Sequence, residues 1–500
     1  MTTAQEETEV TEVIVVGAGP VGLMLAGELR LGGAAVIVVD RLAEPMRESR
    51  ASQLNARTME IFDQRGLLDR LGTVRAEPAG HFGGIPLPVD QIRSVHAGYW
   101  KVPQPRTEAM LGAWATGLGA EVRRGHELRG LAQTGEHVEA EVTGPRGRLR
   151  LRARYLVGCD GESSTVRRLA GIEFSGHDAR RELVRADVAG IDVQLRRFQR
   201  LPRGLAIAGR TGDDVTRVML HEFGAEATGR TAPPAFAELV ASWARVTGED
   251  ISGGTPVWLD VFGDVDRQAA RYRSGRVLLA GDAAHAQMPA SGQALNLGVQ
   301  DAVNLGWKLA AQVRGLAAAG LLDSYHDERH PVGARVLTNV AAQTDLLLGG
   351  QDSAAVRSVF ADLLGLGETR RYLAETLGGL DVRYDVGPGD HPLLGARLPH
   401  ADLLTDAGET TTGTLLRPAR GVLLDLAEDA DGHDRLRATA QSWRDRVDTV
   451  PAKVDGASAL SDLTAALVRP DGHIAWVDRG PAHLESALRR WFGAPAGRTE

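Results

Sequence analysis

Three observations predict that this 500-residue chain is an α/β protein with more than one domain. Residues 13–40 read as a buried strand, a glycine-rich turn, a helix and a second buried strand. Short β-rich runs with one helix, at about residues 233–246, replace this pattern from 173 to 275. A buried strand and long helices follow from Arg276, and a Gly- and Pro-rich stretch from Tyr384 precedes a last mixed segment. The order predicts a Rossmann-like sheet, a separate sheet-based domain and a C-terminal α/β segment.

The opening unit carries Gly17, Gly19 and Gly22 at G-x-G-x-x-G spacing directly after the apolar run Val13–Val16. A second apolar run ends at Asp40. Glycines let backbone amides approach a pyrophosphate, the helix N-terminus supplies partial positive charge, and the carboxylate can bind ribose hydroxyls. This layout predicts dinucleotide binding; a purely structural strand–helix–strand unit with glycine-rich turns is the alternative.

Composition excludes several other classes of function. The formal net charge of −8 gives no overall attraction to nucleic acid or to an anionic membrane. Cys159 is the single cysteine, so no intramolecular disulfide or thiolate metal cluster is expected, which fits a reducing cytoplasm. The acidic N-terminus is no secretory signal, nothing is suited to span a membrane, and the scattered histidines predict no metal site.

Two later segments look like further parts of the same nucleotide site. Cys159-Asp160-Gly161 is followed by Ser164 and Arg167, at a predicted strand–turn–helix. Gly281-Asp282 follows an apolar run, and Pro289, Gly292, Asn296 and Asp301 come next. We expect Asp282 to end a buried strand, where a carboxylate is costly unless it is satisfied by ligand hydroxyls or caps a local turn.

Together these three motifs, in this order, resemble the class A, single-component flavoprotein aromatic hydroxylases. The ESRA, GHFGG and YHDERHPVG segments resemble the subgroup that tailors aromatic polyketides, notably angucyclinones. HPLLGARLPH and RPDGHIAW resemble its C-terminal thioredoxin-like domain. The resemblance implies a discontinuous FAD-binding domain (residues 1–172 and 276–385), an inserted β-sheet substrate domain (173–275) and a thioredoxin-like domain (386–500).

The resemblance also implies the residues that hold non-covalent FAD. Asp40 should bind the adenosine ribose, Arg50 should neutralise the pyrophosphate, and Gln104 should bind the flavin's sugar chain. Asp160 and Arg167 are linked to both FAD and the pyridine nucleotide. Where the family often has G-Q-G, this chain has Ala294 in place of the second glycine, which bears on flavin mobility. The predicted cofactor-binding residues are Gly17, Gly19, Pro20, Val21, Gly22, Asp40, Arg41, Arg50, Gln104, Leu128, Asp160, Gly281, Asp282, Pro289, Gly292, Ala294, Leu295 and Asn296.

The implied activity is hydroxylation of a polycyclic aromatic polyketide. NADPH or NADH reduces FAD, O2 adds at flavin C4a, and a phenolate carbon of the substrate attacks the distal oxygen of the hydroperoxide. A second G-x-G-x-x-G is absent from the sequence, which fits transient nicotinamide binding. The candidate catalytic residues are Pro289, His81 and Arg106. Further candidates for the substrate pocket are His96, Tyr99, Trp100 and Trp258, for which a purely structural role is the alternative.

Two alternatives remain open at this point. A Baeyer–Villiger monooxygenase would use the same flavin adduct on a ketone, and the motifs do not separate the two reactions. A protein that binds FAD or an intermediate without turnover is the other, and Ala294 is the feature that favours it. A flavin halogenase is less expected, because no W-x-W pair occurs. Both a monomer and a homodimer fit the sequence.

Overall fold

The computed structural model describes residues 8–46, 52–212, 214–230, 232–454, 456, 458–478 and 483–496. Its centre is a six-stranded sheet in the order β21-β22-β13-β2-β3-β9, in which only β21 runs antiparallel. The strands are β2 (Val13–Val16), β3 (Val36–Asp40), β9 (Glu121–Arg124), β13 (Tyr155–Gly158), β21 (Arg273–Ser274) and β22 (Val277–Leu279). Strands β2, β13 and β22 are buried on both faces, as continuous apolar runs predict.

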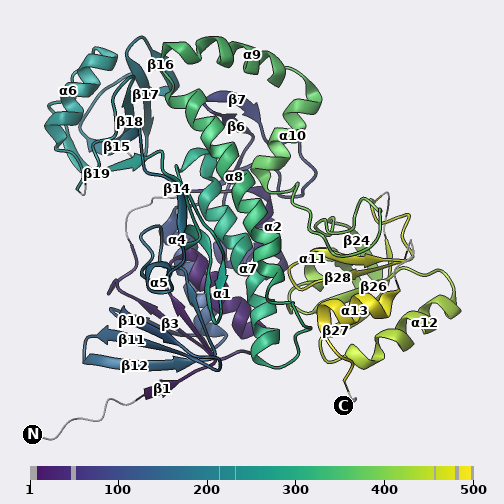
Figure 1. The fold of residues 1–500 in the computed structure, drawn as a ribbon. Coiled ribbons are helices and arrows are strands. Elements are labelled where there is room, and N and C mark those ends of the chain that lie inside the picture. Colours follow the sequence, from purple (N-terminus) through teal and green to yellow (C-terminus); the bar gives the residue numbers. More distant parts are fainter. Residues whose placement is uncertain are drawn as a thin grey trace, which may run out of the picture.

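Helices pack on this sheet and supply most of its core. The covering helices are α1 (Pro20–Leu31), α4 (Gln104–Gly117), α5 (Thr165–Leu169), α7 (Gln293–Val313) and α8 (Ser324–Leu348). Figure 1 shows α1, α7 and α8 side by side through the middle of the molecule. The predicted Rossmann-like unit is therefore confirmed. A four-stranded sheet flanks it, made of β1 (Thr8–Val10), β10 (Glu127–Gln133), β11 (Val138–Gly144) and β12 (Gly147–Ala153).

The sheet-rich insert forms a five-stranded antiparallel sheet in the order β16-β17-β18-β15-β19. Its strands are β15 (Glu182–Ala189), β16 (Arg196–Leu201), β17 (Gly204–Arg210), β18 (Val215–Glu222) and β19 (Thr255–Gly263). Helix α6 (Phe236–Thr247) covers one face, close to the range that the sequence predicts, and ends at Gly248 with φ +77°. In Figure 1 this sheet lies at the top of the molecule, beside the upper part of α8.

Smaller elements connect the two parts. One three-stranded sheet contains β14 (Phe174–His177), β20 (Asp266–Ala269) and β23 (His285–Gln287), in that order. A second three-stranded sheet contains β4 (Gln53–Leu54), β8 (Tyr99–Lys101) and β5 (Ala76–Glu77). A hairpin is formed by β6 (Ala79–Phe82) and β7 (Ile85–Pro88). The remaining helices are α2 (Ala56–Gln64), α3 (Leu68–Leu71), α9 (Ala354–Leu364) and α10 (Gly367–Gly378), with 3₁₀ turns η1 (Gly281–Ala283), η2 (Ala290–Gly292) and η3 (Gln351–Ser353).

The C-terminal part is a six-stranded sheet in the order β25-β24-β27-β26-β28-β29, in which only β26 and β27 pair in parallel. Its elements are β24 (Asp402–Thr405), β25 (Gly408–Thr411), α11 (Thr412–Leu415), β26 (Gly421–Asp425), α12 (Ala430–Ala440), η4 (Gln441–Trp443), β27 (Val447–Val454), β28 (Ala465–Val468), β29 (Ile474–Val477) and α13 (Leu484–Phe492). The predicted fold class, with its thioredoxin-like C-terminal domain, is confirmed. The domain holds no cysteine, so the fold cannot perform dithiol chemistry here.

One feature of this domain differs from what a hairpin turn usually shows. The turn Pro470-Asp471-Gly472, between β28 and β29, is buried, whereas such turns normally lie on the surface. It inserts against α2, α7 and α8, where Arg57 of α2 donates to the Asp471 carbonyl at 2.9 Å. Among the described residues, no helix is both long and apolar enough to cross a membrane.

Candidate active site

The three sequence motifs meet at one edge of the central sheet. They follow β2, β13 and β22, which are neighbouring parallel strands, so their carboxyl ends lie together. The Cys159 amide donates to the Val16 carbonyl at 2.7 Å, and the Ala280 amide donates to the Gly158 carbonyl at 2.9 Å. Segments more than a hundred residues apart thereby form a single site at the topological position where parallel α/β sheets bind nucleotides.

The glycine-rich turn fits a pyrophosphate. Gly17 has φ +106°, and a Cβ there would lie 2.3 Å from the Cys159 carbonyl oxygen. A Cβ on Gly22 would lie 1.9 Å from the Gly17 carbonyl oxygen, so both glycines allow the turn to close. At Gly19, by contrast, a Cβ would meet no protein atom within 4 Å. This open space lies directly before the N-terminus of α1, where an anion is favoured.

Asp40 ends β3 beside this turn. Its Oδ2 accepts from the Ala18 amide at 2.6 Å and its Oδ1 from the Leu42 amide at 2.8 Å. These two bonds fix a half-buried carboxylate that still has acceptor capacity for ribose hydroxyls. Arg41 is exposed next to it, and Arg50 lies outside the described residues. Leu128 is buried in β10, and Gln104 is half-buried at the start of α4.

The second motif serves mainly as a connector. Asp160 accepts from the Ser164 hydroxyl at 2.5 Å and from the Thr165 amide at 2.7 Å, so it caps α5. Arg167 donates to the Ala283 carbonyl at 2.8 Å and lies 3.6 Å from the Phe174 ring centroid. Arg167 thus ties the second motif to the third, and its burial lowers the pKa of its guanidinium.

The third motif requires one correction. We expected Asp282 to end a buried strand, but β22 ends at Leu279, and Asp282 lies exposed in η1. The backbone turns at Gly281, which has φ +63°, and this turn brings the next side chain out of the sheet. The Asp282 side chain is therefore exposed at the surface. A ligand hydroxyl can reach it there, and no buried carboxylate has to be desolvated.

Residues 288–292, which we call the 288–292 loop, lead into α7. Ser291 has φ +50° although it is not glycine, and its hydroxyl contacts the Gln343 Oε1 at 2.6 Å and the His81 carbonyl at 3.1 Å. Asn296 donates to the Gly292 carbonyl at 2.6 Å and accepts from the Asn55 amide at 3.0 Å, so it holds the loop against α2. Pro289 is exposed, and Ala294 and Leu295 are half-buried.

A buried charge network stands behind this loop. Asp301 of α7 contacts His285 at 2.7 Å, accepts from the Gly281 amide at 3.1 Å, and pairs with Arg329 of α8 at 2.7 Å. Burial alone would raise the pKa of Asp301, but Arg329 and His285 outweigh it and hold that pKa below its usual value. Sequence reasoning did not single out Arg329, although it lies within the quoted YHDERHPVG segment.

The other candidate residues fall into two groups. Arg106 is exposed and donates to the Leu71 carbonyl at the end of α3, His96 contacts Asp63 at 3.2 Å, and the Trp100 indole donates to the His96 carbonyl at 2.9 Å. Tyr99 is buried in an apolar cluster under α10. In contrast, the His81 carbonyl accepts from the 288–292 loop, and Trp258 lies on the five-stranded sheet.

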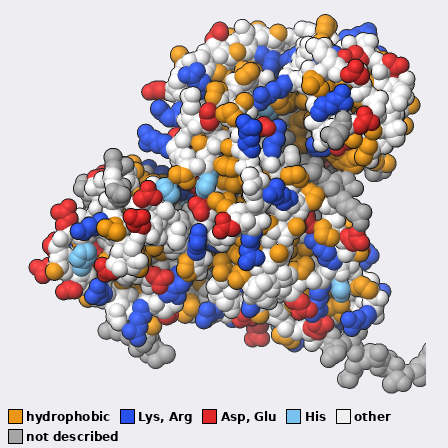
Figure 2. All heavy atoms as spheres, turned by 180° about the vertical axis from the view of Figure 1, so that it is seen from behind, with side chains coloured by type: hydrophobic (Ala, Val, Ile, Leu, Met, Phe, Trp, Pro, Cys, Tyr) orange, Lys and Arg blue, Asp and Glu red, His pale blue; other side chains and the backbone are white. Residues whose placement is uncertain are grey.

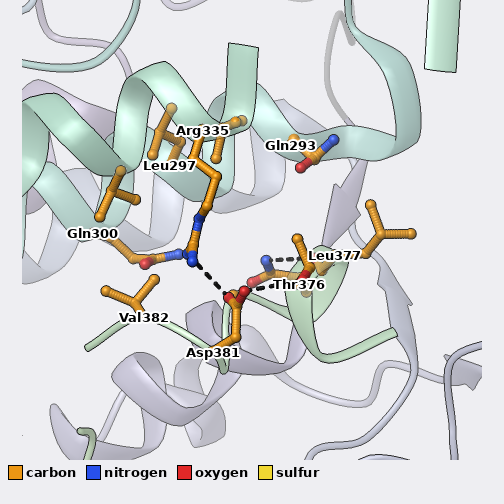
Figure 3. Close-up of a pocket in the computed structure, with 12 residues that line it drawn as sticks. Gln293, Leu297, Gln300, Arg335, Thr376, Leu377, Asp381 and Val382 are labelled. Carbon is orange, nitrogen blue, oxygen red and sulfur yellow. Dashed lines mark hydrogen bonds and ion pairs between the residues drawn. The ribbon is translucent and has the colours of Figure 1, made fainter. Parts of the chain in front are cut away.

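A separate, small hollow lies beside α7 (Figure 3). It is lined by α7, α8 and the end of α10, and not by the glycine-rich turn. Its charged side chains satisfy one another: Asp381 pairs with Arg335 at 3.2 Å and accepts from the Thr376 hydroxyl at 2.9 Å. The hollow borders the third motif through Gln293, but neither of the first two motifs lines it.

Comparison with known proteins identifies the family. The FAD binding domain family matches residues 10–340, and the C-terminal domain family of aromatic-ring hydroxylases matches residues 391–495. The chain therefore belongs to the FAD-dependent aromatic-ring hydroxylases, and it is a flavin monooxygenase with FAD as its cofactor. This confirms the resemblance that the three motifs indicate.

Individual relatives span the whole chain. The 12-dehydrotetracycline 5-monooxygenase/anhydrotetracycline 6-monooxygenase of Streptomyces rimosus is 43% identical, over 97% of this chain and 99% of that protein. The structure of CabE, an aromatic hydroxylase from angucycline biosynthesis, is 51% identical with a TM-score of 0.93, over 97% and 99% of the two chains. The Diels-Alderase PyrE3, from the biosynthetic pathway of pyrroindomycins, is 38% identical with a TM-score of 0.84, over 97% and 100%.

Proposed function

We propose that this flavin monooxygenase hydroxylates a polycyclic aromatic polyketide, with NAD(P)H as reductant and O2 as the second substrate. The observation that carries the proposal is the convergence of the three motifs at one sheet edge, next to a loop that contacts the five-stranded sheet. The names of the tetracycline and angucycline relatives support the substrate class. In this proposal, residues 1–172 and 276–385 hold FAD, and residues 173–275 bind the substrate. Residues 386–500 have a packing role, against the helices of the FAD-binding domain.

We propose the following contacts with the cofactor. The open space at Gly19 and the N-terminus of α1 take the pyrophosphate, Asp40 binds the adenosine ribose, and Asp282 binds the sugar chain of the flavin. The N-terminus of α7 has no side-chain cap, and its amides would stabilise the negative charge that a reduced flavin carries at the pyrimidine end of its ring. FAD, when bound, supplies the activation of oxygen.

His81 acts in this proposal as a hydrogen-bond donor to the substrate. Its Nδ1 accepts from the Gly84 amide at 3.2 Å, so its proton resides on Nε2. Burial, with a contribution from Arg197, lowers the pKa of His81 to about 4, and the ring is neutral at pH 7. The His81 ring packs against Phe198 in a tilted arrangement, with 4.0 Å between the ring centroids. A neutral ring with Nε2–H can orient a carbonyl or phenol oxygen, whereas removing a proton would require it to give up the Gly84 bond.

The test uses purified protein saturated with FAD, with NADPH, 18O2 and a panel of polycyclic phenols. We expect NADPH oxidation to be stimulated by a substrate, and the product to carry one 18O atom as a new ring hydroxyl. Parallel reactions under 16O2 and without NADPH are the controls. A lactone that contains 18O would show that the enzyme inserts oxygen next to a ketone and does not hydroxylate a ring. Substrate turnover without NADPH oxidation would contradict both and match the kind of activity for which PyrE3 is named.

A further inference from the structure

One face of the five-stranded sheet is directed toward the 288–292 loop. On β15, Val184, Ala186 and Val188 pack with the α6 residue Trp243. Leu183 belongs to the opposite face, where it clusters with Met288 and Ala290 of the loop. Because side chains alternate along a strand, Arg185 lies on the same face as Leu183, about 7 Å further along.

The neighbouring strand β19 adds aromatic residues to this face. Its Leu259 packs toward α6, so Trp258, Asp260 and Phe262 point the other way. The register places Arg185 opposite Asp260, and Leu183 opposite Phe262. The Arg185 guanidinium carbon lies 4.9 Å from the Trp258 ring centroid and 5.8 Å from that of Phe262. We call Arg185, Trp258 and Phe262 the cationic floor.

Arg185 is buried, with only 7% of it exposed. Arg196 of the same sheet is buried to a similar degree, and it pairs with Glu249 at 2.8 Å. Burial and the nearby Arg217 lower the pKa of Arg185 to about 10, against the opposing effect of Asp187 and Asp260, so it remains cationic at neutral pH. Arg217, on the adjacent strand, is held by Asp187 through two bonds of 2.6 and 2.7 Å. Keeping a charge buried is costly, and flat aromatic rings beside a guanidinium suit a planar ligand that carries oxygen atoms.

Figure 2 shows the molecule from behind, and its surface is hollowed in the upper half of this view, with hydrophobic side chains in the depth of the hollow. We propose that Arg185, on the cationic floor, is a specificity-determining residue that binds an acidic ring oxygen of the substrate. The planar fork of the guanidinium fits two oxygens side by side, such as a phenol next to a quinone carbonyl. This assignment rests on the proposed function, because it names the chemical class of polycyclic substrate that this site selects.

The experiment compares two probes on the FAD-loaded enzyme, followed by quenching of tryptophan fluorescence. The probes are 1,8-dihydroxyanthraquinone and 1,8-dimethoxyanthraquinone, which share a ring system but differ in acidic oxygens. The variants are Arg185→Met and Arg185→Lys. Arg245→Met is the matched control, because Arg245 lies on α6, which covers the far face of the sheet, and pairs there with Glu222. FAD content and the unfolding midpoint report structural damage.

We expect the wild type and Arg245→Met to prefer the dihydroxy probe. Arg185→Met should weaken that probe about tenfold or more, as the loss of a charged hydrogen bond implies, and leave the dimethoxy probe unchanged. Arg185→Lys should fold and keep the positive charge. Its affinity for the dihydroxy probe should fall by an intermediate amount, because an ammonium group lacks the planar fork of a guanidinium.

Equal affinity of wild type and Arg185→Met for the dihydroxy probe would overturn the assignment, and so would an equal loss for both probes. If both Arg185 variants lost FAD or failed to fold, Arg185 would have a structural role, and the assignment would also be overturned. Absence of binding of either probe to the wild type counts against it too. Arg185-dependent binding without any oxygenated product from the phenol panel would leave the assignment standing and refute the proposed hydroxylation instead.

Discussion

Gly17 and Gly19 stand two residues apart in the same turn, but the structure places different demands on them. Gly17 has a positive φ, and its missing side chain makes room for the chain itself. Gly19 has ordinary extended angles, φ −77° and ψ 180°, and its missing side chain leaves space that no protein atom fills. Gly17 is therefore required by the fold, and Gly19 leaves open the space that we propose for the pyrophosphate.

This difference predicts separate outcomes for Gly19→Ala and Gly17→Ala. Gly19→Ala should leave the unfolding midpoint of the apoprotein unchanged or slightly raised and weaken FAD binding at least about tenfold, because its methyl group enters the pyrophosphate space. Gly17→Ala should destabilise the apoprotein by about 1–3 kcal/mol from backbone strain alone. Thermal unfolding without FAD and titration with FAD measure the two effects. Unchanged FAD affinity in Gly19→Ala would remove this space from the cofactor site.

Residues were predictable from the sequence where a local pattern gives a physical reason. The glycine spacing and the carboxylate at the end of β3 are such patterns, and the structure places them together. Asp282 was misjudged because the turn at Gly281 cannot be seen in an apolar run. Arg185 gave no signal: its burial results from the pairing of β15 with β19, which joins positions about seventy residues apart.

At the scale of elements, the hairpin of β28 and β29 joins the C-terminal domain to the rest of the protein through buried ion pairs. Arg469 pairs with Glu328 of α8 at 2.6 Å and also with Asp471 in its own turn. It lies 4.4 Å from the Trp491 ring centroid. Glu328 is further bound by Lys308 of α7 at 2.8 Å. The turn thus joins the two helices that stand behind the 288–292 loop.

Arg469→Met should destabilise the protein by about 3–5 kcal/mol, because it leaves two buried carboxylates without their main partner. Arg435→Met is the control: Arg435 pairs with Asp478 at the surface, with 68% of its side chain exposed, and its loss should cost about 1 kcal/mol or less. Denaturant unfolding of the FAD-free proteins measures both. Equal, small effects would show that the hairpin network is not a major source of stability.

The strands and helices were well predicted, because the spacing of apolar residues along the sequence indicates each element locally. The residues Pro470, Asp471 and Gly472 are typical of a turn, and they form one. Its burial was not predictable, because it depends on partners in α2, α7 and α8 that only the assembled molecule brings close.

At the scale of the whole molecule, acid should act mainly through this buried network. Burial alone would raise the pKa of Glu328, but Arg469 and Lys308 outweigh it and lower that pKa to about 2 from an ordinary 4.5. A lowered folded pKa means that Glu328 stabilises the protein fully above about pH 4.5, and that this stabilisation is lost as the pH falls toward 2. The wild type should therefore lose stability steeply over this window.

Glu328→Gln tests this dependence. Its free energy of unfolding should be lower at pH 7 and should fall less steeply between pH 4.5 and 2, by up to about 1.4 kcal/mol per pH unit. Glu485→Gln, which removes an exposed pair with Arg489, should keep the slope of the wild type. Identical slopes for all three proteins would mean that other carboxylates account for the acid sensitivity.

The buried turn also bears on how the enzyme is made. Arg65, which pairs with Glu28 of α1 at 2.5 Å, donates to the Pro470 carbonyl, 405 residues further along the chain. A ribosome synthesises α1 and the glycine-rich turn near the start and this acceptor near the end. The buried contacts of Arg65 are therefore complete only after nearly all of the chain has emerged. We expect stable binding of FAD by the finished polypeptide and not by the nascent one.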